Sequence, residues 1–230
     1  MRVSVAFTPA EAAAAPVAVA VDVLRASSTI CAALAAGFES VACVEDVGDA
    51  LALRAPGTLL AGERDCLRID GFELGNSPAE AAASPRSGRL VLSTTNGTRL
   101  LVAAAARCER VLVGSLANLG AVAAAVRALA PEEVVVLCAG VEGAFALDDA
   151  YCAGRLVQEL GGVRADSAVA AEALVRTCPD ALERSASAAN LRRAGLAADV
   201  DWCAVEDRLG VVPAVTARGP RSVEVATLAA

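Results

Sequence analysis

Histidine and lysine are both missing from this 230-residue chain, and all 20 of its basic residues are arginine. Without histidine there is no Ser-His-Asp triad, no histidine-phosphatase mechanism and no imidazole ligand for a metal. Without lysine, Schiff-base chemistry and the lysine of a Walker A loop are excluded. The groups left for chemistry are carboxylates, hydroxyls, amides, thiols, arginine and backbone N–H, which suit a hard cation such as Mg²⁺.

Long apolar runs are missing as well, although hydrophobic residues make up 56% of the chain. Alanine supplies much of that fraction, and no run reaches the roughly 18 residues that span a bilayer. The opening stretch Met1–Pro9 is too short and too polar for a signal peptide. We therefore expect a cytoplasmic protein with no membrane partner. The net charge of −7 argues against nucleic acid as a partner.

Several familiar motifs are absent or fail on inspection. None of the eight cysteines forms a C-x-x-C pair, so we expect buried thiols rather than a zinc site or disulfides. Cys178 and Arg184 have the C-x5-R spacing of cysteine phosphatases, but the loop between them has two acidic residues and no glycine. Asp199-Val-Asp201 does not follow an apolar strand, as an aspartyl nucleophile would. No G-x-G-x-x-G follows a strand.

Short apolar runs, each followed by polar residues and an alanine-rich stretch, recur along the chain. Runs that are apolar throughout predict a largely parallel sheet covered by helices on both faces, a three-layer α/β/α fold. A mixed sheet remains open. We expect one domain, residues 1–230, with a more helical C-terminal portion from about residue 166. The predicted strands are Val3–Phe7, Val17–Val21, Val41–Val44, Leu59–Glu63, Leu90–Ser93, Val111–Val113 and Val134–Cys138.

Polar side chains gather at the carboxyl ends of these strands, where open α/β sheets bind ligands. Each of these ends is followed by a helix whose first N–H groups favour an anion. The set exceeds what helix capping requires. Its members are Asp22, Arg25, Glu63, Thr95, Asn96, Thr98, Ser115, Asn118 and Glu142.

Local structural roles remain open for several of them. Ser28, Thr98 and Asn118 could be helix N-caps, and Asn96-Gly97 is a common turn dipeptide. A local structural role explains Asp22 less well, because a carboxylate at the end of a buried strand is costly to ionise unless a cation pairs with it. Arginine three residues downstream and Mg²⁺ are the two candidates.

Taken together and in order, segments along nearly the whole chain resemble the 2-phosphosulfolactate phosphatases of coenzyme M biosynthesis. That resemblance implies an α/β/α fold, Mg²⁺ dependence and phosphate-ester hydrolysis. Near Ser185 it also leads us to expect a His-Gly pair, where this chain has Ser187-Ala188. The matching stretches are Val21–Thr29, Gly62-Glu63, Gly71–Glu80, Thr94–Thr98, Gly114–Asn118, Leu137–Gly140, Ala146–Ala150, Gly195–Cys203 and Val212-Pro213.

Hydrolysis of a phosphomonoester requires neutralised phosphoryl charge, a positioned nucleophile and a stabilised leaving oxygen. The residues expected to act in catalysis are Asp22, Arg25, Glu63, Asn76, Ser77 and Glu80. Those expected to bind phosphate are Ser27, Ser28, Thr29, Thr95, Asn96, Gly97, Thr98, Ser115 and Asn118. Those expected to ligate Mg²⁺ are Asp22, Glu63 and Asp149.

The expected activity is Mg²⁺-dependent hydrolysis of a small anionic phosphate monoester, 2-phosphosulfolactate, to sulfolactate and phosphate. A phosphatase for a different phospho-acid and a non-catalytic anion-binding protein on the same fold remain the alternatives. The expected partner is the substrate itself, and a homo-oligomer is left open.

Overall fold

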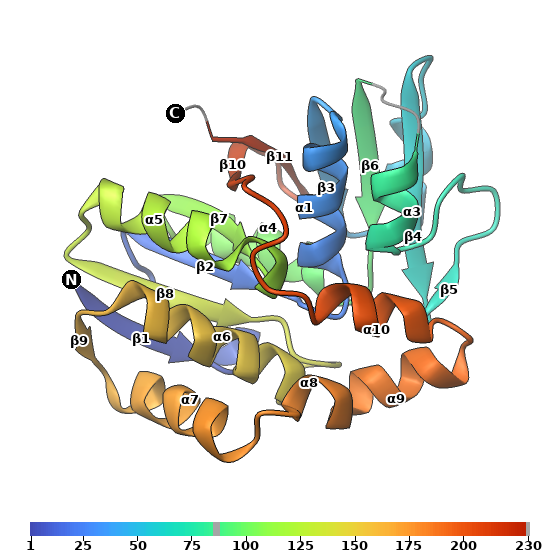
Figure 1. The fold of residues 1–230 in the computed structure, drawn as a ribbon. Coiled ribbons are helices and arrows are strands. Elements are labelled where there is room, and N and C mark those ends of the chain that lie inside the picture. Colours follow the sequence, from blue (N-terminus) through green and yellow to red (C-terminus); the bar gives the residue numbers. More distant parts are fainter. Residues whose placement is uncertain (85–87, 229–230) are drawn as a thin grey trace.

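The computed structural model describes residues 1–84 and 88–228, in which one mixed 11-stranded sheet forms the framework (Figure 1). Its strands lie in the order β5-β4-β6-β3-β11-β10-β7-β2-β8-β1-β9. Helices cover both faces, so the predicted three-layer α/β/α fold is confirmed. The predicted strands agree with the observed ones to within one residue at each end.

One half of the sheet is entirely parallel. Every residue of its β2 strand is buried, and the valines and alanines of that strand enter different hydrophobic clusters. The valines pack with α5, α6 and α7, and the alanines pack with α4 on the opposite face. The strands are β9 (Val163–Arg164), β1 (Arg2–Ala6), β8 (Glu133–Cys138), β2 (Val17–Val21) and β7 (Arg110–Gly114). The helices are α4 (Gly97–Arg107), α5 (Leu119–Leu129), α6 (Leu147–Leu160) and α7 (Asp166–Thr177).

The other half has three parallel strands and an antiparallel edge strand. The parallel strands are β3 (Ser40–Val44), β6 (Arg89–Ser93) and β4 (Thr58–Arg64), and the edge strand is β5 (Leu67–Arg68). Helix α1 packs against α3 beside this half. The helices are α1 (Ala26–Ala36), α2 (Val47–Ala52) and α3 (Pro78–Ala83). Elsewhere in the chain there are two short 3-10 helices, η1 (Pro9–Glu11) and η2 (Leu116–Asn118).

A C-terminal hairpin joins the two halves. Strand β11 (Ser222–Thr227) pairs antiparallel with β3, and β10 (Pro213–Arg218) reaches β7 through Ala214 and Leu112. Neither strand of the hairpin is among those predicted from the sequence. The hairpin makes the sheet mixed, because β10 is antiparallel to β7 and β11 is antiparallel to β3, so the two parallel halves run in opposite directions through the sheet.

Three helices lie beyond the carboxyl ends of the strands (Figure 1). They are α8 (Ala181–Arg184), α9 (Ala186–Arg193) and α10 (Ala197–Cys203). Ala188, Leu191 and Val200 form a small hydrophobic cluster of their own, against which Leu24 and Cys66 pack. The cluster attaches α9 and α10 to the loops that follow β2 and β4.

Within the described residues, no helix is both long and apolar enough to cross a bilayer. All eight cysteines fall in that part of the chain, and all are free thiols, most of them buried. The expectation of thiols rather than disulfides is confirmed.

Candidate active site

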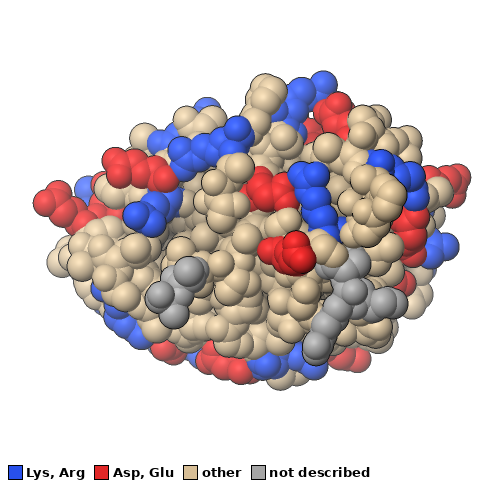
Figure 2. Space-filling model, turned by 90° about the horizontal axis from the view of Figure 1, so that it is seen from above, with Lys and Arg blue, Asp and Glu red and all other residues tan. Residues whose placement is uncertain are grey.

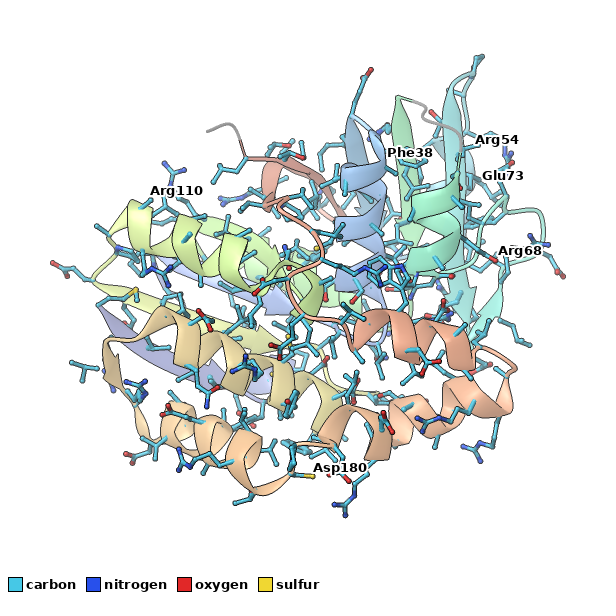
Figure 3. All side chains as sticks on the ribbon, in the orientation of Figure 1. Phe38, Arg54, Arg68, Glu73, Arg110 and Asp180 are labelled. Carbon is cyan, nitrogen blue, oxygen red and sulfur yellow. The ribbon has the colours of Figure 1, made fainter. Side chains whose placement is uncertain are left out.

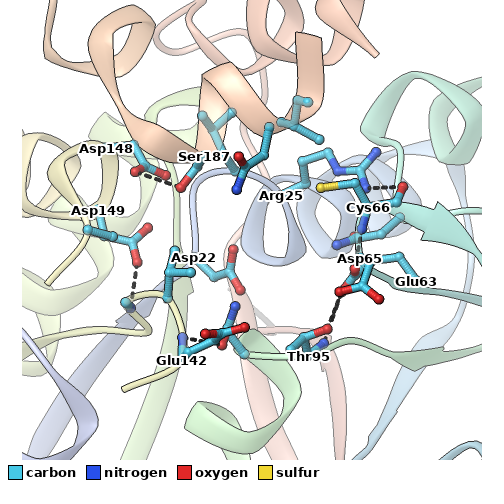
Figure 4. A pocket seen from close by; sticks show the side chains of 18 residues that line it. Asp22, Arg25, Glu63, Asp65, Cys66, Thr95, Glu142, Asp148, Asp149 and Ser187 are labelled. Carbon is cyan, nitrogen blue, oxygen red and sulfur yellow. Dashed lines mark hydrogen bonds between the residues drawn. The ribbon is translucent and has the colours of Figure 1, made fainter. Parts of the chain in front are cut away.

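A cavity of about 130 Å³ opens at the carboxyl ends of β2, β4, β6 and β8 (Figure 4). Loops after these strands form its floor, the first turn of α6 forms one side, and α9 closes it from above. Open α/β sheets bind ligands at the carboxyl ends of their strands. Among the residues singled out in the sequence, those that line the cavity are Asp22, Arg25, Glu63, Asn76, Thr95, Asn96, Glu142 and Asp149.

The charge of the cavity is strongly one-sided. Six carboxylates line it, and Arg25 is the one cation among the described lining residues. Two pairs of acidic side chains lie on opposite sides of the cavity in Figure 4, Asp148 and Asp149 on one side and Glu63 and Asp65 on the other. On the face drawn in Figure 2, arginine and acidic side chains are interspersed. The cavity is therefore a local concentration of negative charge.

Asp22 stands at the centre of this arrangement, directly after β2. Its Oδ1 accepts a hydrogen bond of 3.2 Å from the N–H of Ala26. Burial, followed by the negative charges of Asp148 and Glu63, raises its pKa to about 7. Gly97 lies against it, and a Cβ at that position would sit 2.5 Å from Asp22 Oδ2. Gly97 thus leaves the room that this carboxylate occupies.

The first turn of α6 supplies two buried carboxylates. Asp149 accepts hydrogen bonds of 2.9 Å from the N–H of Val23 and of 2.9 Å from the N–H of Gly140. Burial, with the charges of Asp148 and Asp22, raises the pKa of Asp149 well above its ordinary value. Burial likewise raises the pKa of Asp148 to about 6. Acidic residues are favoured in the first turn of any helix, but these two carboxylates also face the cavity.

Ser187 occupies the place where the family resemblance suggested a His-Gly pair. It lines the cavity, and its Oγ donates a 3.0 Å hydrogen bond to Asp148 Oδ1. A hydroxyl therefore supports this carboxylate from α9.

Glu63 holds together two loops at the other side of the cavity. Its Oε1 accepts hydrogen bonds from the N–H and Oγ1 of Thr95, at 2.9 and 3.1 Å, and its Oε2 accepts one of 3.0 Å from the N–H of Cys66. Both oxygens thus have protein donors already. A metal ligated here would share these oxygens with the loops.

Arg25 is buried, with 4% of its surface exposed, and its partner is not the one that sequence reasoning considered. Its Nη1 donates to Asp199 Oδ2 at 2.7 Å, and its Nη2 donates to the carbonyl of Cys66 at 3.2 Å. The expected structural alternative was an ion pair with Asp22. The ion pair instead reaches to α10.

The remaining residues predicted to be catalytic lie beside the cavity in different settings. Asn76 lines it, and its buried Oδ1 has no hydrogen-bond partner among the described residues. Ser77 lies behind the cavity wall, where it caps α3 and donates a 2.6 Å hydrogen bond to Asp199. Glu80 is exposed and accepts a 2.8 Å hydrogen bond from the N–H of Gly75.

Most of the hydroxyls predicted to bind phosphate do not line the cavity. Ser27 and Ser28 donate hydrogen bonds of 2.8 Å to the carbonyls of Asp22 and Val23, which fixes the turn into α1. The Oγ1 of Thr29 is buried in that helix without a partner among the described residues. Thr98 bonds to Thr94, and Ser115 and Asn118 form a capping box. Their hydrogen bonds stabilise the loops that carry the site, which agrees with the alternative that these residues cap helices.

Sequence reasoning assigned no role to several residues that the fold brings to the site. They come from the turn after β4, from the first turn of α6 and from the helices α9 and α10. These residues are Asp65, Cys66, Asp148, Ser187, Asn190 and Asp199. The rejected C-x5-R segment lies elsewhere, at the periphery beside α8, where Figure 3 labels Asp180.

The donor atoms of the cavity suit Mg²⁺ by type, because nearly all of them are oxygen. Among residues 1–84 and 88–228, no three His, Cys, Asp or Glu side chains form a ready-made metal cluster. Mg²⁺ does not require one, because it keeps several waters and is commonly held by one or two carboxylates together with a substrate phosphate. Asp22, Glu63 and Asp149 all line the cavity and are carboxylates of this kind, and Asn76, whose Oδ1 has no partner among the described residues, lines it as well.

Comparison with known proteins identifies the family of this chain. The family model described as 2-phosphosulpholactate phosphatase matches residues 4–218. A protein of Thermus thermophilus named probable 2-phosphosulfolactate phosphatase is 43% identical over 95% of this chain and 96% of its own length. One of Methanothermobacter thermautotrophicus, named 2-phosphosulfolactate phosphatase, is 39% identical over 93% and 92%. The resemblance seen in the sequence is thereby confirmed, and the chain belongs to the 2-phosphosulpholactate phosphatase family.

Proposed function

We propose that this chain is a cytoplasmic, Mg²⁺-dependent phosphatase that hydrolyses 2-phosphosulfolactate to sulfolactate and phosphate. The observation that carries the proposal is the cavity at the carboxyl ends of β2, β4, β6 and β8, with six carboxylates and one arginine that is already paired. The names of the relatives support the choice of substrate.

The charge balance explains why a metal belongs in the proposal. The substrate carries a phosphate, a carboxylate and a sulfonate, so it is repelled by a cavity of acidic side chains. A low-dielectric cavity strengthens that repulsion relative to water. A bound Mg²⁺ would supply the positive charge that offsets phosphoryl oxygens and activates water or the leaving oxygen.

Each residue of the proposed site has a role that follows from its chemistry. Asp22 and Asp149 would hold Mg²⁺, and both are fixed in place by backbone N–H donors. Arg25 would contact phosphoryl oxygens through the N–H groups that its protein partners leave unused. Asn76 would add a polar contact from the α3 side. Hydrolysis breaks the bond between phosphorus and the ester oxygen, leaving the water oxygen on phosphate and a proton on the alcohol.

A phosphate-release assay over a small panel of phospho-acids, with Mg²⁺ or with excess chelator, tests the proposal. Release from 2-phosphosulfolactate that needs Mg²⁺ is the expected result. A preference for another phospho-acid would change the proposed substrate but leave the proposed mechanism in place. Binding of phosphate with no turnover of any ester would identify an anion-binding protein, and full activity in chelator would remove the metal.

A further inference from the structure

We propose that Asp199, from helix α10, is a positioning residue that holds the Arg25 guanidinium in the orientation that receives the phosphoryl group. The inference rests on the proposed function, because it assigns a role to a residue behind the same cavity. Asp199 belongs to the D-x-D segment that sequence reasoning set aside as a nucleophile.

Contacts from three parts of the chain fix this pair. Asp199 Oδ2 accepts the 2.7 Å hydrogen bond from Arg25 Nη1, and its Oδ1 accepts one of 2.6 Å from Ser77 Oγ at the start of α3. The carbonyl of Cys66, after β4, accepts from Arg25 Nη2 at 3.2 Å. The side chains of Arg25 and Asp199 are only 3% and 5% exposed. A buried planar group with two such partners has little freedom to rotate.

The geometry leaves donors for a ligand. A guanidinium carries five N–H groups in one rigid plane. The contacts with Asp199 and Cys66 use one N–H on each of its two terminal nitrogens. Because Arg25 also lines the cavity, the donors that remain in that plane are available to an anion held there. Asp199 itself does not line the cavity, so it can act on substrate only through Arg25.

Stability alone is a poor reason for such a pair. Removing two charges from water costs free energy that their attraction barely repays, and apolar residues of similar volume often stabilise a fold as well or better. Orientation of a binding group is a different matter, because a displacement of about 1 Å at a reacting centre can cost on the order of 100-fold in rate. The pair is therefore better explained by what it positions.

The test compares Asp199→Asn with Asp201→Asn. Asp201 is exposed on the same helix, so its substitution makes the same change of charge away from the cavity. Turnover per folded molecule and the Kd for inorganic phosphate in saturating Mg²⁺ are measured for both. We expect Asp199→Asn to lose about 10- to 100-fold in kcat with a smaller change in KM, and to bind phosphate more weakly. Asp201→Asn should stay within about twofold of wild type.

A double-mutant cycle separates positioning from a merely structural role. If Asp199 acts through Arg25, Arg25→Ala/Asp199→Ala should turn over within about twofold of Arg25→Ala alone. This comparison removes both charges, so it remains usable if Asp199→Asn folds poorly. Independent, multiplying effects on turnover would overturn the proposal. So would an Asp199→Asn enzyme with wild-type turnover, whatever its melting temperature.

The phosphate-binding measurement keeps this inference distinct from the proposed function. If wild type hydrolyses no phospho-acid but binds phosphate, the proposed function fails, and weaker phosphate binding by Asp199→Asn still supports the positioning role. A wild-type chain that binds no phosphate, with or without Mg²⁺, overturns both.

Discussion

Gly97 shows how the identity of one residue sets the position of a charged group. It opens α4 at a φ that any residue can adopt, so the requirement for glycine is one of space. A Cβ there would lie 2.5 Å from Asp22 Oδ2 and 2.5 Å from Ala26 Cβ. Sequence reasoning placed Gly97 among phosphate-binding residues. Its contact with Asp22 indicates that it also determines where that carboxylate stands.

We therefore expect Gly97→Ala to displace Asp22 and lower kcat by about 100-fold. The melting temperature should fall as well, because Ala26 Cβ can give way to the added methyl group only if α1 shifts, and overpacking of this kind costs about 1–3 kcal/mol. Gly48→Ala, within α2, is the control, since no atom lies within 4 Å of its added Cβ. Steady-state kinetics on both variants decides the matter, and full turnover by Gly97→Ala would show that Asp22 can move without consequence.

Cys178 should be dispensable for catalysis. Its Sγ lies near Asp180 Oδ1 and Arg184 Nη1, at 3.5 and 3.7 Å, and it does not line the cavity. Cys178→Ser should therefore keep turnover within about twofold of wild type. A loss beyond about 100-fold in a folded variant would restore a cysteine nucleophile.

At the scale of elements, the C-terminal hairpin determines whether the two halves of the sheet form one core. Val223 and Val225 of β11 are buried in the same cluster as residues of α1 and α4. Glu224 pairs with Arg89 of β6 through bonds of 2.6 and 3.1 Å. The hairpin thus contributes both apolar packing and a charged contact to the half that carries Glu63.

Val225→Ala should lower the free energy of unfolding by about 2 kcal/mol, because it removes two buried methyl groups at the centre of the sheet. Val205→Ala is the control, since Val205 is 48% exposed and should change by less than about 0.5 kcal/mol. Urea denaturation of both variants gives the comparison. Equal stability of the two would mean that the hairpin packs less tightly than its burial indicates.

The same scale separates what the sequence predicts from what it does not. Strands such as Val17–Val21 are encoded by local apolar runs, and the polar residues after them follow from where a parallel strand ends. The hairpin and the cavity roof depend on contacts between distant segments. Arg25 and Asp199 are 174 residues apart, and no local pattern relates them. Residues at the site that come from α9 and α10 were missed for that reason.

For the molecule as a whole, the carboxylates of the cavity work against folding when no cation is bound. Desolvation, with repulsion from Asp148 and Glu63, raises the pKa of Asp22 to about 7, and desolvation raises that of Asp148 to about 6, from an ordinary value near 3.8. At these two residues, folded protein therefore holds more protons than unfolded protein between about pH 4 and pH 7. By linkage, the free energy of unfolding must fall as the pH rises through that range.

Mg²⁺ should reverse much of this trend. It binds the deprotonated carboxylates, so its stabilising effect should grow from pH 5 to pH 7.5 as protons cease to compete for them. We expect the melting temperature of metal-free protein to fall across that range by on the order of 5 °C, and a smaller fall in saturating Mg²⁺.

Asp22→Asn should flatten the metal-free curve and weaken the Mg²⁺ effect, since it removes one of the cavity carboxylates. A thermal-shift series with and without Mg²⁺ makes the measurement. Stability that rises with pH in metal-free protein, or a Mg²⁺ effect larger at pH 5 than at pH 7.5, would contradict the view that cavity carboxylates are offset by a metal.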